Sequence, residues 1–521
     1  MSLTSIITLS GVRMRRHIVP EKFCAERCLR AKGYKTRAAT SLADSLNFIV
    51  STLAELRNRH RDFYRGADDY ILLNMEALAV GLGHLSQASK CVHILLELGV
   101  LESDNHYRIG RYHRGGTSKS KGYRITKEFR SKSVVVECTD ARIQQRIERH
   151  FSPIIQALLA PASPDQLSAS DAVVAATFRT LAATGIHHEA AIADTTGRRE
   201  ITMEAVGIFW EPLCQPWNKK TYEYTYAQLD QVKGGYSFPA PRKMAKNYEK
   251  RRTYANRVQE PLAAYETRMG RTMLDLLEAS VENRHQADLQ VIEALRQGGA
   301  GYHFARRPDG KSRLYSNVAN LSKAMRPYLY VKDTGQALVE IDIKNSQPLV
   351  LAGLVIAHYG LGTLPADAAE YVKQVETGRA YEASMMEMGL MDKQTDEDSP
   401  AHKKARDRFK VRVFTELYFG EVRIMNQTKL GKAFKEQFPS VDRLIRIYKA
   451  EHYQDFAVAL QRAEAAVVID TVLAQLQTVG VHALTIHDSV LCQAVDASLI
   501  RDLLVNGFQE VYGITPTLSQ K

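Results

Sequence analysis

Apolar residues recur at helical spacing between residues 74 and 102, where the pattern predicts two amphipathic helices with Gly81 and Gly83 at their junction. Ser86 stands where the second helix would begin and is a suitable N-cap. The apolar face of that second helix is predicted to consist of Ala88, Cys91, Val92, Leu95 and Leu96. The spacing predicts a helix-turn-helix with one face turned toward a core.

Two strand-like runs follow at residues 100–109 and 121–126, and a loop containing Gly115 and Gly116 joins them. The hairpin resembles the wing of winged-helix domains. From residue 106 to residue 132, one acid, Glu128, stands among basic residues, which are Arg108, Arg111, Arg114, Lys119, Lys121, Arg124, Lys127, Arg130 and Lys132. A helix pair with a solvated basic loop is the alternative, but the hairpin favours a surface that neutralises nucleic-acid phosphates.

The middle of the chain is less informative. Residues 136–240 are an Ala-rich helical stretch followed by an aromatic segment, and no function is predicted for them. Basic residues are then concentrated at residues 242–257, ahead of a long helical pattern. This region is either a solvated charged helix or a helical pair that grips a duplex, as a polymerase thumb does. Short strands and helices follow from residue 301 onward, so the whole chain is predicted to be α+β.

Composition narrows the class of partner. The chain has 521 residues, of which 45% are hydrophobic and 25% charged, so it can bury a large core across several domains. Its formal net charge of +12 favours an anionic partner, with nucleic acid the commonest. The six cysteines form no zinc-type cluster, and the longest apolar run, at residues 349–357, is too short to cross a bilayer. These features predict a soluble, cytoplasmic protein with no membrane partner.

A strand at residues 337–342 ends in Asp342, and an apolar helix opens at Ser346 with Pro348 in its first turn. A carboxylate at a strand end, with the backbone carbonyl of Ile343 beside it, offers the oxygen ligands that Mg²⁺ prefers. The segment predicts one half of a divalent-cation site.

Arg406, Lys410, Phe414 and Tyr418 recur every four residues. They therefore follow one stripe of a helix that drifts by about 40° at each step. Two cations followed by two aromatic rings are poor core patterning, but they can bind a triphosphate and pack on a base and sugar. The stripe predicts a nucleotide-binding helix.

His487 and Asp488 lie between two short apolar strands within residues 481–495, which predicts a hairpin with the acid at its turn. An aspartate in a tight turn is ordinary by itself. Gln461 and Glu464, on the preceding helix, are weaker candidates, because a polar pair on a helix is usually solvated.

A fourth segment, residues 310–321, contains Arg313-Leu314 and Asn320-Leu321. Together and in this order, the four segments resemble family A DNA polymerases, the bacterial DNA polymerase I type, and also the single-subunit phage and mitochondrial RNA polymerases. The resemblance covers residues 300–521. The segments depart from the family at three places: Lys311-Ser312 follow Gly310, three residues instead of one separate Asp342 from Ser346, and Phe419 precedes Gly420.

The resemblance implies a right-hand polymerase with a palm built on a small antiparallel sheet, helical fingers and thumb, and two Mg²⁺ ions, with Mn²⁺ as an alternative. The implied metal ligands are Asp342, Ile343 through its carbonyl, and Asp488. The implied catalytic residues are Asp342, Asp488, Arg406, Lys410 and His487. The implied nucleotide-binding residues are Arg406, Lys410, Phe414, Tyr418 and Gln347. The implied primer- or template-binding residues are Arg313, Asn320 and Thr415.

The partners expected are a DNA template, a primer or nascent strand, and nucleoside triphosphates. Phe414, Ser346-Gln347 and the segment around Arg313 point toward DNA synthesis, whereas Tyr315, Thr415 and Ser489 point toward RNA. DNA polymerase is preferred slightly, and an RNA polymerase or primase-like enzyme remains open. A third alternative is a winged-helix replication initiator or regulator without catalysis. Reduced fingers and the absence of an assignable exonuclease segment suit a mobile-element or phage enzyme.

The domain organisation predicted from these patterns has five parts. They are an N-terminal extension (1–40), a winged-helix-like nucleic-acid-binding domain (41–135), a helical connecting region (136–240), thumb-like helices (241–300) and a catalytic palm with reduced fingers (301–521).

Overall fold

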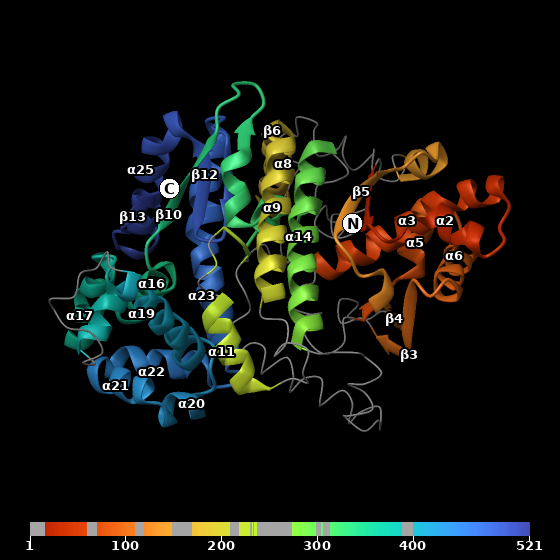
Figure 1. The fold of residues 1–521 in the computed structure, drawn as a ribbon. Helices are drawn as coiled ribbons and strands as arrows, with labels where there is room; N and C mark the ends of the chain where they lie inside the picture. The colour runs from red at the N-terminus through yellow and green to blue at the C-terminus, as the bar shows by residue number, and fades with distance from the viewer. Residues whose placement is uncertain are drawn as a thin grey trace.

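The computed structural model describes residues 16–59, 70–109, 119–147, 149, 169–208, 218–229, 232, 234–236, 273–297, 304–305, 313–387 and 400–521. In Figure 1 an N-terminal unit (red to orange) and a C-terminal unit (green to blue) lie on opposite sides of a set of long helices. Each of these two units has its own apolar core. The basic segment at 242–257 and the hairpin loop with Gly115 and Gly116 lie outside the described residues.

The N-terminal unit contains a two-stranded sheet, in which β1 (Arg16–Pro20) pairs antiparallel with β5 (Ser133–Glu137). Helices α2 (Ala25–Ala31) and α3 (Thr36–Arg59) follow β1. Their apolar residues join the same core as the later helices. The predicted boundary between residues 40 and 41 is therefore wrong, because it cuts through α3, and the boundary after residue 135 cuts through β5.

The predicted helix pair is present as α5 (Met75–Leu82) and α6 (Leu85–Glu97). The hairpin is also present: β3 (Leu101–Ile109) pairs with β4 (Lys119–Ile125), and β2 (Ile71–Leu72) pairs with the other edge of β4. The N-cap of α6 is not Ser86 as predicted. It is His84, whose Nδ1 accepts the Ser86 backbone N–H at 3.2 Å, because the helix begins at Leu85, two residues earlier than a Ser86 cap would place it.

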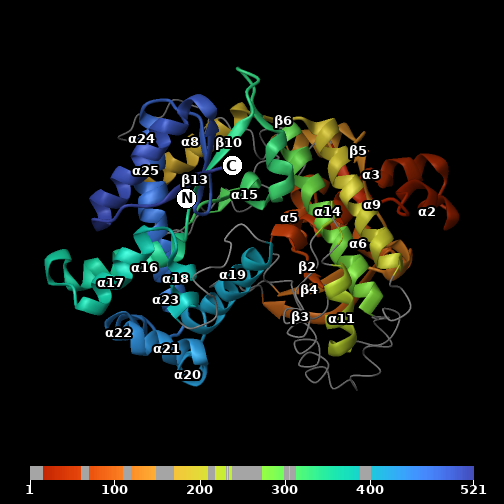
Figure 2. The ribbon, with the colours of Figure 1, turned by 60° about the vertical axis from the view of Figure 1, so that its left-hand side comes forward.

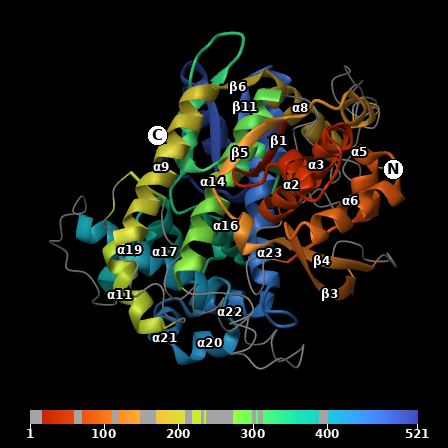
Figure 3. The same ribbon diagram turned by 45° about the vertical axis from the view of Figure 1, so that its right-hand side comes forward.

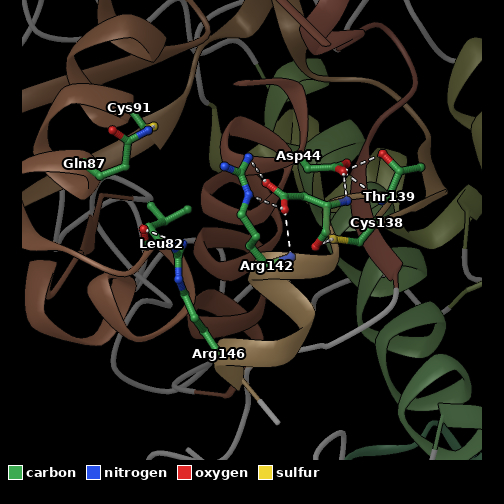
Figure 4. A network of polar contacts seen from close by, with 9 residues as sticks. Asp44, Leu82, Gln87, Cys91, Cys138, Thr139, Arg142 and Arg146 are labelled. Carbon is green, nitrogen blue, oxygen red and sulfur yellow. Dashed lines mark hydrogen bonds and ion pairs between the residues drawn. The ribbon is translucent and has the colours of Figure 1, made fainter. Parts of the chain in front are cut away.

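Asp44 of α3 ties the chain after β5 to the rest of the unit (Figure 4). Its Oδ2 accepts the backbone N–H of Thr139 at 2.7 Å, the Thr139 hydroxyl at 2.8 Å and the backbone N–H of Asp140 at 2.6 Å. Arg146, further along the same segment, donates to the Leu82 carbonyl at 2.9 Å. These bonds fix the segment against α3 and α5.

Two residues of the predicted basic surface have acidic partners within the fold. Arg124 is buried, pairs with Glu102 and lies over the Tyr70 ring at 4.7 Å. Lys132 lies 3.6 Å from Glu200, which belongs to the central helices. The prediction that the basic residues of the hairpin neutralise phosphates does not fit Arg124, because this side chain is buried and its charge is paired with Glu102.

Long helices make up the central layer (Figure 2). They are α8 (Ala169–Ala183), α9 (His188–Ile208) and α14 (Met273–Gln297). Helices α9 and α14 run side by side, and β1, α3 and β5 of the N-terminal unit contact α14, as Figure 3 shows. Strand β6 (Thr184–Ile186) pairs with β9 (Leu329–Val331), and α11 (Lys219–Leu229) packs near the lower end of this layer.

The C-terminal unit is built on a four-stranded antiparallel sheet in the order β11-β12-β10-β13. The strands are β10 (Leu338–Ile343), β11 (Ala483–Ile486), β12 (Ser489–Gln493) and β13 (Leu518–Gln520). Because side chains alternate along β10, Val339, Ile341 and Ile343 lie on one face, and Glu340 and Asp342 lie on the other.

Helices contact this sheet and the elements beside it. The helices near the sheet are α16 (Ser346–Tyr359), α25 (Ala497–Tyr512) and a continuous helix formed by α23 (Asp455–Ala465), the π-helical segment η7 (Ala466–Leu473) and α24 (Ala474–Thr478). Further helices gather at the other end of the unit (Figure 1). They are α17 (Ala366–Glu376), α18 (Ala380–Glu387), α19 (Pro400–Arg412), the π-helical segment η6 (Val413–Tyr418), α20 (Val422–Gln427), α21 (Lys429–Gln437) and α22 (Pro439–Tyr448).

The predicted α+β class is confirmed, since long helices accompany small antiparallel sheets. None of the helices in the described ranges has the length and apolar character needed to span a membrane.

Candidate functional site

Asp342 and Asp488 come together although they lie far apart in the sequence. Asp342 is directly opposite Ser489 in the β10–β12 pairing, so Asp488 precedes its partner by one residue. The backbone N–H of Ile343 also donates to the Asp488 carbonyl at 3.2 Å. The two acids therefore occupy neighbouring strand ends at one edge of the sheet.

The backbone on each side of this edge is strained. His487, in the two-residue turn between β11 and β12, has a φ of 56°, and Asn345, just after β10, has a φ of 53°. Apart from Asn105, these are the positive-φ non-glycine residues of the described chain. The left-handed region is unfavourable for a residue with a Cβ, and such strain concentrates at functional sites.

Glu464 of α23 lies at the centre of a buried polar network, with 1% of its surface exposed. Arg313 forms two hydrogen bonds with its carboxylate, from Nε to Oε1 at 2.6 Å and from Nη2 to Oε2 at 2.8 Å. The Ser346 hydroxyl and the Gln347 amide also donate to Oε2, at 3.0 and 2.8 Å. The Glu464 carboxylate therefore fixes Arg313 and the first turn of α16.

The pairing with Glu464 keeps the Arg313 guanidinium protonated. Burial alone would lower the pKa of the Arg313 guanidinium, but the Glu464 carboxylate outweighs burial and leaves the pKa above its ordinary value. Bidentate arginine–carboxylate pairs also have a fixed geometry. Arg313 is therefore a rigid, permanently charged group beside Asp488.

The surroundings of Asp488 raise its pKa well above the ordinary value of an aspartate. Burial, the Glu464 carboxylate and the Asp342 carboxylate raise the pKa of Asp488 to about 6, and Arg313 offsets only part of this. Within the described part of the chain, no ion pair reaches Asp488. Three carboxylates without enough positive charge repel one another, and a bound cation would relieve that repulsion.

Glu340 and Asp342, on the same face of β10, each have a cationic partner. Arg326 donates to Glu340 at 2.7 Å, and the Lys521 ammonium lies 2.6 Å from Asp342 Oδ2. Burial would raise the pKa of Glu340, but the Arg326 hydrogen bond and charge, together with Lys521, hold it below its ordinary value. Glu340 therefore remains ionised at neutral pH.

The cationic end of the predicted stripe lies beside this edge. Arg406 of α19 pairs with Glu382 and donates to the Asn345 side chain at 3.1 Å. The Arg406 guanidinium and the Lys410 ammonium both lie over the Tyr381 ring, at 5.6 and 5.9 Å from its centroid. Arg406 is half-buried, whereas Lys410 is exposed, so Lys410 is the more accessible cation.

The two aromatic residues of the stripe differ in how far they are buried. Segment η6 continues α19 with a π-helical turn, and Phe414 and Tyr418 remain in contact with ring centroids 5.7 Å apart. Phe414 is half-buried, and the Lys410 ammonium lies 5.9 Å from its ring. Tyr418 is buried, with its hydroxyl 3.5 Å from that of Tyr371. The prediction that Tyr418 packs on a base or sugar does not fit, because its ring belongs to the core.

The other site residues predicted from the sequence differ in burial and in their contacts. His487 is half-buried, with its ring edge-on to Tyr315 at 6.0 Å, and burial lowers its pKa, so it is neutral at pH 7. Asn320 ends the short helix α15 (Asn317–Asn320) and is exposed. Thr415 donates to the Arg412 carbonyl at 3.4 Å. Gln347 is buried, and its side-chain amide donates to Glu464 at 2.8 Å.

Sequence reasoning ranked Glu464 too low, since it was expected to be solvated. A signal was available: Glu464 stands in the run Ala463-Glu464-Ala465-Ala466-Val467-Val468-Ile469, and a lone charge in an apolar helical run indicates a buried, paired charge. Lys521 and Glu382 carried no comparable signal. Their partners Asp342 and Arg406 are reached only through the tertiary fold.

The donor set at the sheet edge fits divalent cations. Asp342 and Asp488 supply carboxylate oxygens. Burial, followed by the Glu464 and Asp342 carboxylates, raises the pKa of Asp488, and a bound cation would relieve the repulsion among these carboxylates. His17, Asp44 and Cys138 form another buried group with ligand atoms within 4.8 Å of one another, in the N-terminal unit. That group does not suit a metal as well, because Asp44 Oδ2 already accepts three hydrogen bonds and burial raises the pKa of the Cys138 thiol to about 12.

Comparison with known proteins does not assign the chain to a family. No protein-family model matches the chain, and no curated protein matches it. Among solved structures, the POL domain of Pol1 from M. smegmatis, in complex with DNA primer-template and dNTP, is similar over 73% of this chain and 72% of that chain, with 12% identity and a TM-score of 0.41. Similarity at that level does not establish a shared fold, so the proposals below rest on the site's geometry.

Proposed function

We propose that this chain is a template-directed nucleic-acid polymerase, with its reaction centre at the sheet edge where Asp342 and Asp488 meet. The observation that carries the proposal is the strand register, which places Asp342 opposite Ser489 and beside Asp488. A helix that presents Arg406 and Lys410 reaches the same edge through the bond from Arg406 to Asn345. The acidic residues that would bind metal ions and the basic residues that would bind a triphosphate therefore lie at the same edge of the sheet.

Asp342, Asp488 and the Ile343 carbonyl would hold two divalent ions, Mg²⁺ or alternatively Mn²⁺. When bound, such ions lower the pKa of an attacking hydroxyl and stabilise charge on departing pyrophosphate. Lys410, which is exposed, would bind the triphosphate together with Arg406. Phe414 would pack against the base or sugar from its half-buried position.

Arg313, held by Glu464, would contact the primer strand, and His487 would lie near the primer end. Support comes from the fixed geometry of the Arg313–Glu464 pair and from the position of His487 in the strained turn immediately before Asp488. A rigid cation beside the reaction centre can orient a phosphate backbone without losing side-chain entropy at each binding event.

The substrates are proposed to be deoxynucleoside triphosphates on a DNA template. Phe414 and the pair Ser346-Gln347 favour DNA, and both members of that pair are locked onto Glu464. The N-terminal unit is proposed to be a winged-helix module that binds the template. Support comes from its element order α3, β2, α5, α6, β3, β4 and from its sheet order β2-β4-β3, in which the hairpin follows the second helix of the pair.

A primer-extension assay with Mg²⁺, run separately with dNTPs and with NTPs, tests the proposal. We expect dNTP incorporation, and a loss of at least about a hundredfold in rate for Asp488→Ala. Asp502→Ala is the matched control, because Asp502 is an exposed aspartate on α25, and this variant should retain full activity. Incorporation that survives Asp488→Ala would overturn the metal assignment, and use of NTPs alone would replace DNA by RNA as the product.

A further inference from the structure

Lys521 follows β13 and is fixed by the strand register to the polar face of the sheet. Its backbone N–H donates to the Glu340 carbonyl at 2.9 Å, and its carbonyl accepts the Glu340 N–H at 3.2 Å. Residues that exchange both bonds in an antiparallel pair project their side chains to the same face. The Lys521 side chain therefore lies on the face that carries Glu340 and Asp342.

On that face the Lys521 ammonium contacts Asp342 rather than its direct cross-strand partner. Nζ lies 2.6 Å from Asp342 Oδ2 and 3.9 Å from Glu340 Oε1. Glu340 already accepts a 2.7 Å hydrogen bond from Arg326, which leaves Lys521 to neutralise Asp342. The side chain of Lys521 is 39% exposed, so the pair is weak and can open without moving the core.

We infer that the Lys521 ammonium takes the place of a divalent ion at Asp342 in the metal-free protein and must leave that carboxylate when the ion binds. The inference rests on the proposed function, because it takes Asp342 as a metal ligand. Two cations at contact distance from one carboxylate oxygen repel each other, so ion and ammonium compete for Asp342. Lysine has a long flexible stem, which lets the ammonium withdraw into solvent while β13 stays paired.

The competition makes Lys521 a residue that sets the metal affinity of the site. In the metal-free protein it compensates one of the two acids, while Asp488 stays without an ion pair among the described residues. Removing the ammonium should therefore have two opposite effects. The metal-free sheet edge loses stability, because repulsion among Asp342, Asp488 and Glu340 is less compensated, and the site gains affinity for the ion.

The test is Mn²⁺ titration of the full chain without nucleotide or nucleic acid, followed by the electron paramagnetic resonance signal of free Mn²⁺. For Lys521→Gln we expect a dissociation constant lower by about twofold to fivefold, which is the range of a half-exposed ion pair. We also expect a lower melting temperature without metal, and a difference from wild type that disappears at saturating Mn²⁺. Lys521→Arg, which keeps the charge, should bind Mn²⁺ more weakly than Lys521→Gln.

Arg501→Gln is the matched control. Arg501 donates to the Gln520 side chain at 3.0 Å, so its loss disturbs the same strand without changing the charge at Asp342, and Mn²⁺ affinity should stay at the wild-type value. Asp342→Asn separates the two hypotheses. Unchanged Mn²⁺ binding in Asp342→Asn overturns the proposed metal site itself. Weakened binding in Asp342→Asn, together with unchanged or weaker binding in Lys521→Gln, overturns the role of Lys521 alone.

Discussion

The N-terminal unit and the sheet edge of the C-terminal unit each enclose an aspartate, in opposite electrostatic surroundings. Asp44 accepts three hydrogen bonds from Thr139 and Asp140, two of them from backbone N–H groups. Asp488 instead faces Glu464 and Asp342, and burial together with these carboxylates raises its pKa to about 6. The Asp44 carboxylate is stabilised by hydrogen bonds, whereas no cation among the described residues forms an ion pair with the Asp488 carboxylate.

The difference separates a structural acid from a functional one. A buried charge that accepts several N–H donors stabilises the folded chain, while one placed against other carboxylates destabilises it. Strongly perturbed acids of the second kind are typical of functional sites. Stability measurements on matched substitutions in the two regions test this distinction.

The largest effect is expected at the pair that borders Asp488. Arg313→Met should destabilise the C-terminal unit by about 3–5 kcal/mol, because it leaves Glu464 buried and unpaired. Urea denaturation followed by circular dichroism measures the loss, and hydrogen exchange locates it. The double variant Arg313→Met/Glu464→Gln should recover part of the stability. A double variant no more stable than Arg313→Met would show that the unpaired charge is not the cause.

A somewhat smaller loss is expected for Asp44→Ala in the N-terminal unit, about 2–4 kcal/mol, because three buried donors lose their acceptor. Asp44→Asn keeps an acceptor oxygen and should lose less. Urea denaturation with hydrogen exchange of residues 133–147 distinguishes the two variants. Equal, small losses for both would remove the contrast between Asp44 and Asp488.

A smaller effect, of opposite sign, is expected at Asp488 itself. Asp488→Asn should stabilise the metal-free protein at pH 8 by about 1–3 kcal/mol, because it removes a carboxylate that is ionised at unfavourable cost. Saturating Mn²⁺ should reverse the order, since only the wild type binds the ion well. Thermal unfolding with and without Mn²⁺ measures both outcomes, and destabilisation of the metal-free variant would contradict the assignment.

The pH dependence of this stabilisation follows from the raised pKa. Between the ordinary value of 3.8 and about 6, the folded protein binds more protons at Asp488 than the unfolded chain does. The contribution of Asp488 is therefore most favourable below pH 4 and is lost as pH rises through 6. Relative to Asp488→Asn, metal-free wild type should lose about 1 kcal/mol between pH 5 and pH 7.

The local sequence pattern was sufficient to predict several helices and strands of the molecule. The helix pair within residues 74–102, the hairpin after it and the strand that carries Asp342 were all predicted, because turn residues and apolar periodicity are local properties. The strand ends at Ile343, one residue later than predicted. The spacing from Arg406 to Phe414 also located a helix whose Arg406 side chain reaches the sheet edge through Asn345. Domain boundaries were less accurate, since α3 and β5 belong to a core assembled from distant segments.

The sequence by itself determined which residues carry charge and which local elements present them, because helix and strand periodicity depend on near neighbours. Only the tertiary structure decided how those charges are paired. It buried Glu464 against Arg313, placed Tyr418 in the core and brought Lys521 to Asp342. The physical reason is that desolvation and Coulomb energy depend on distance in space, and strand register joins residues that no local pattern relates.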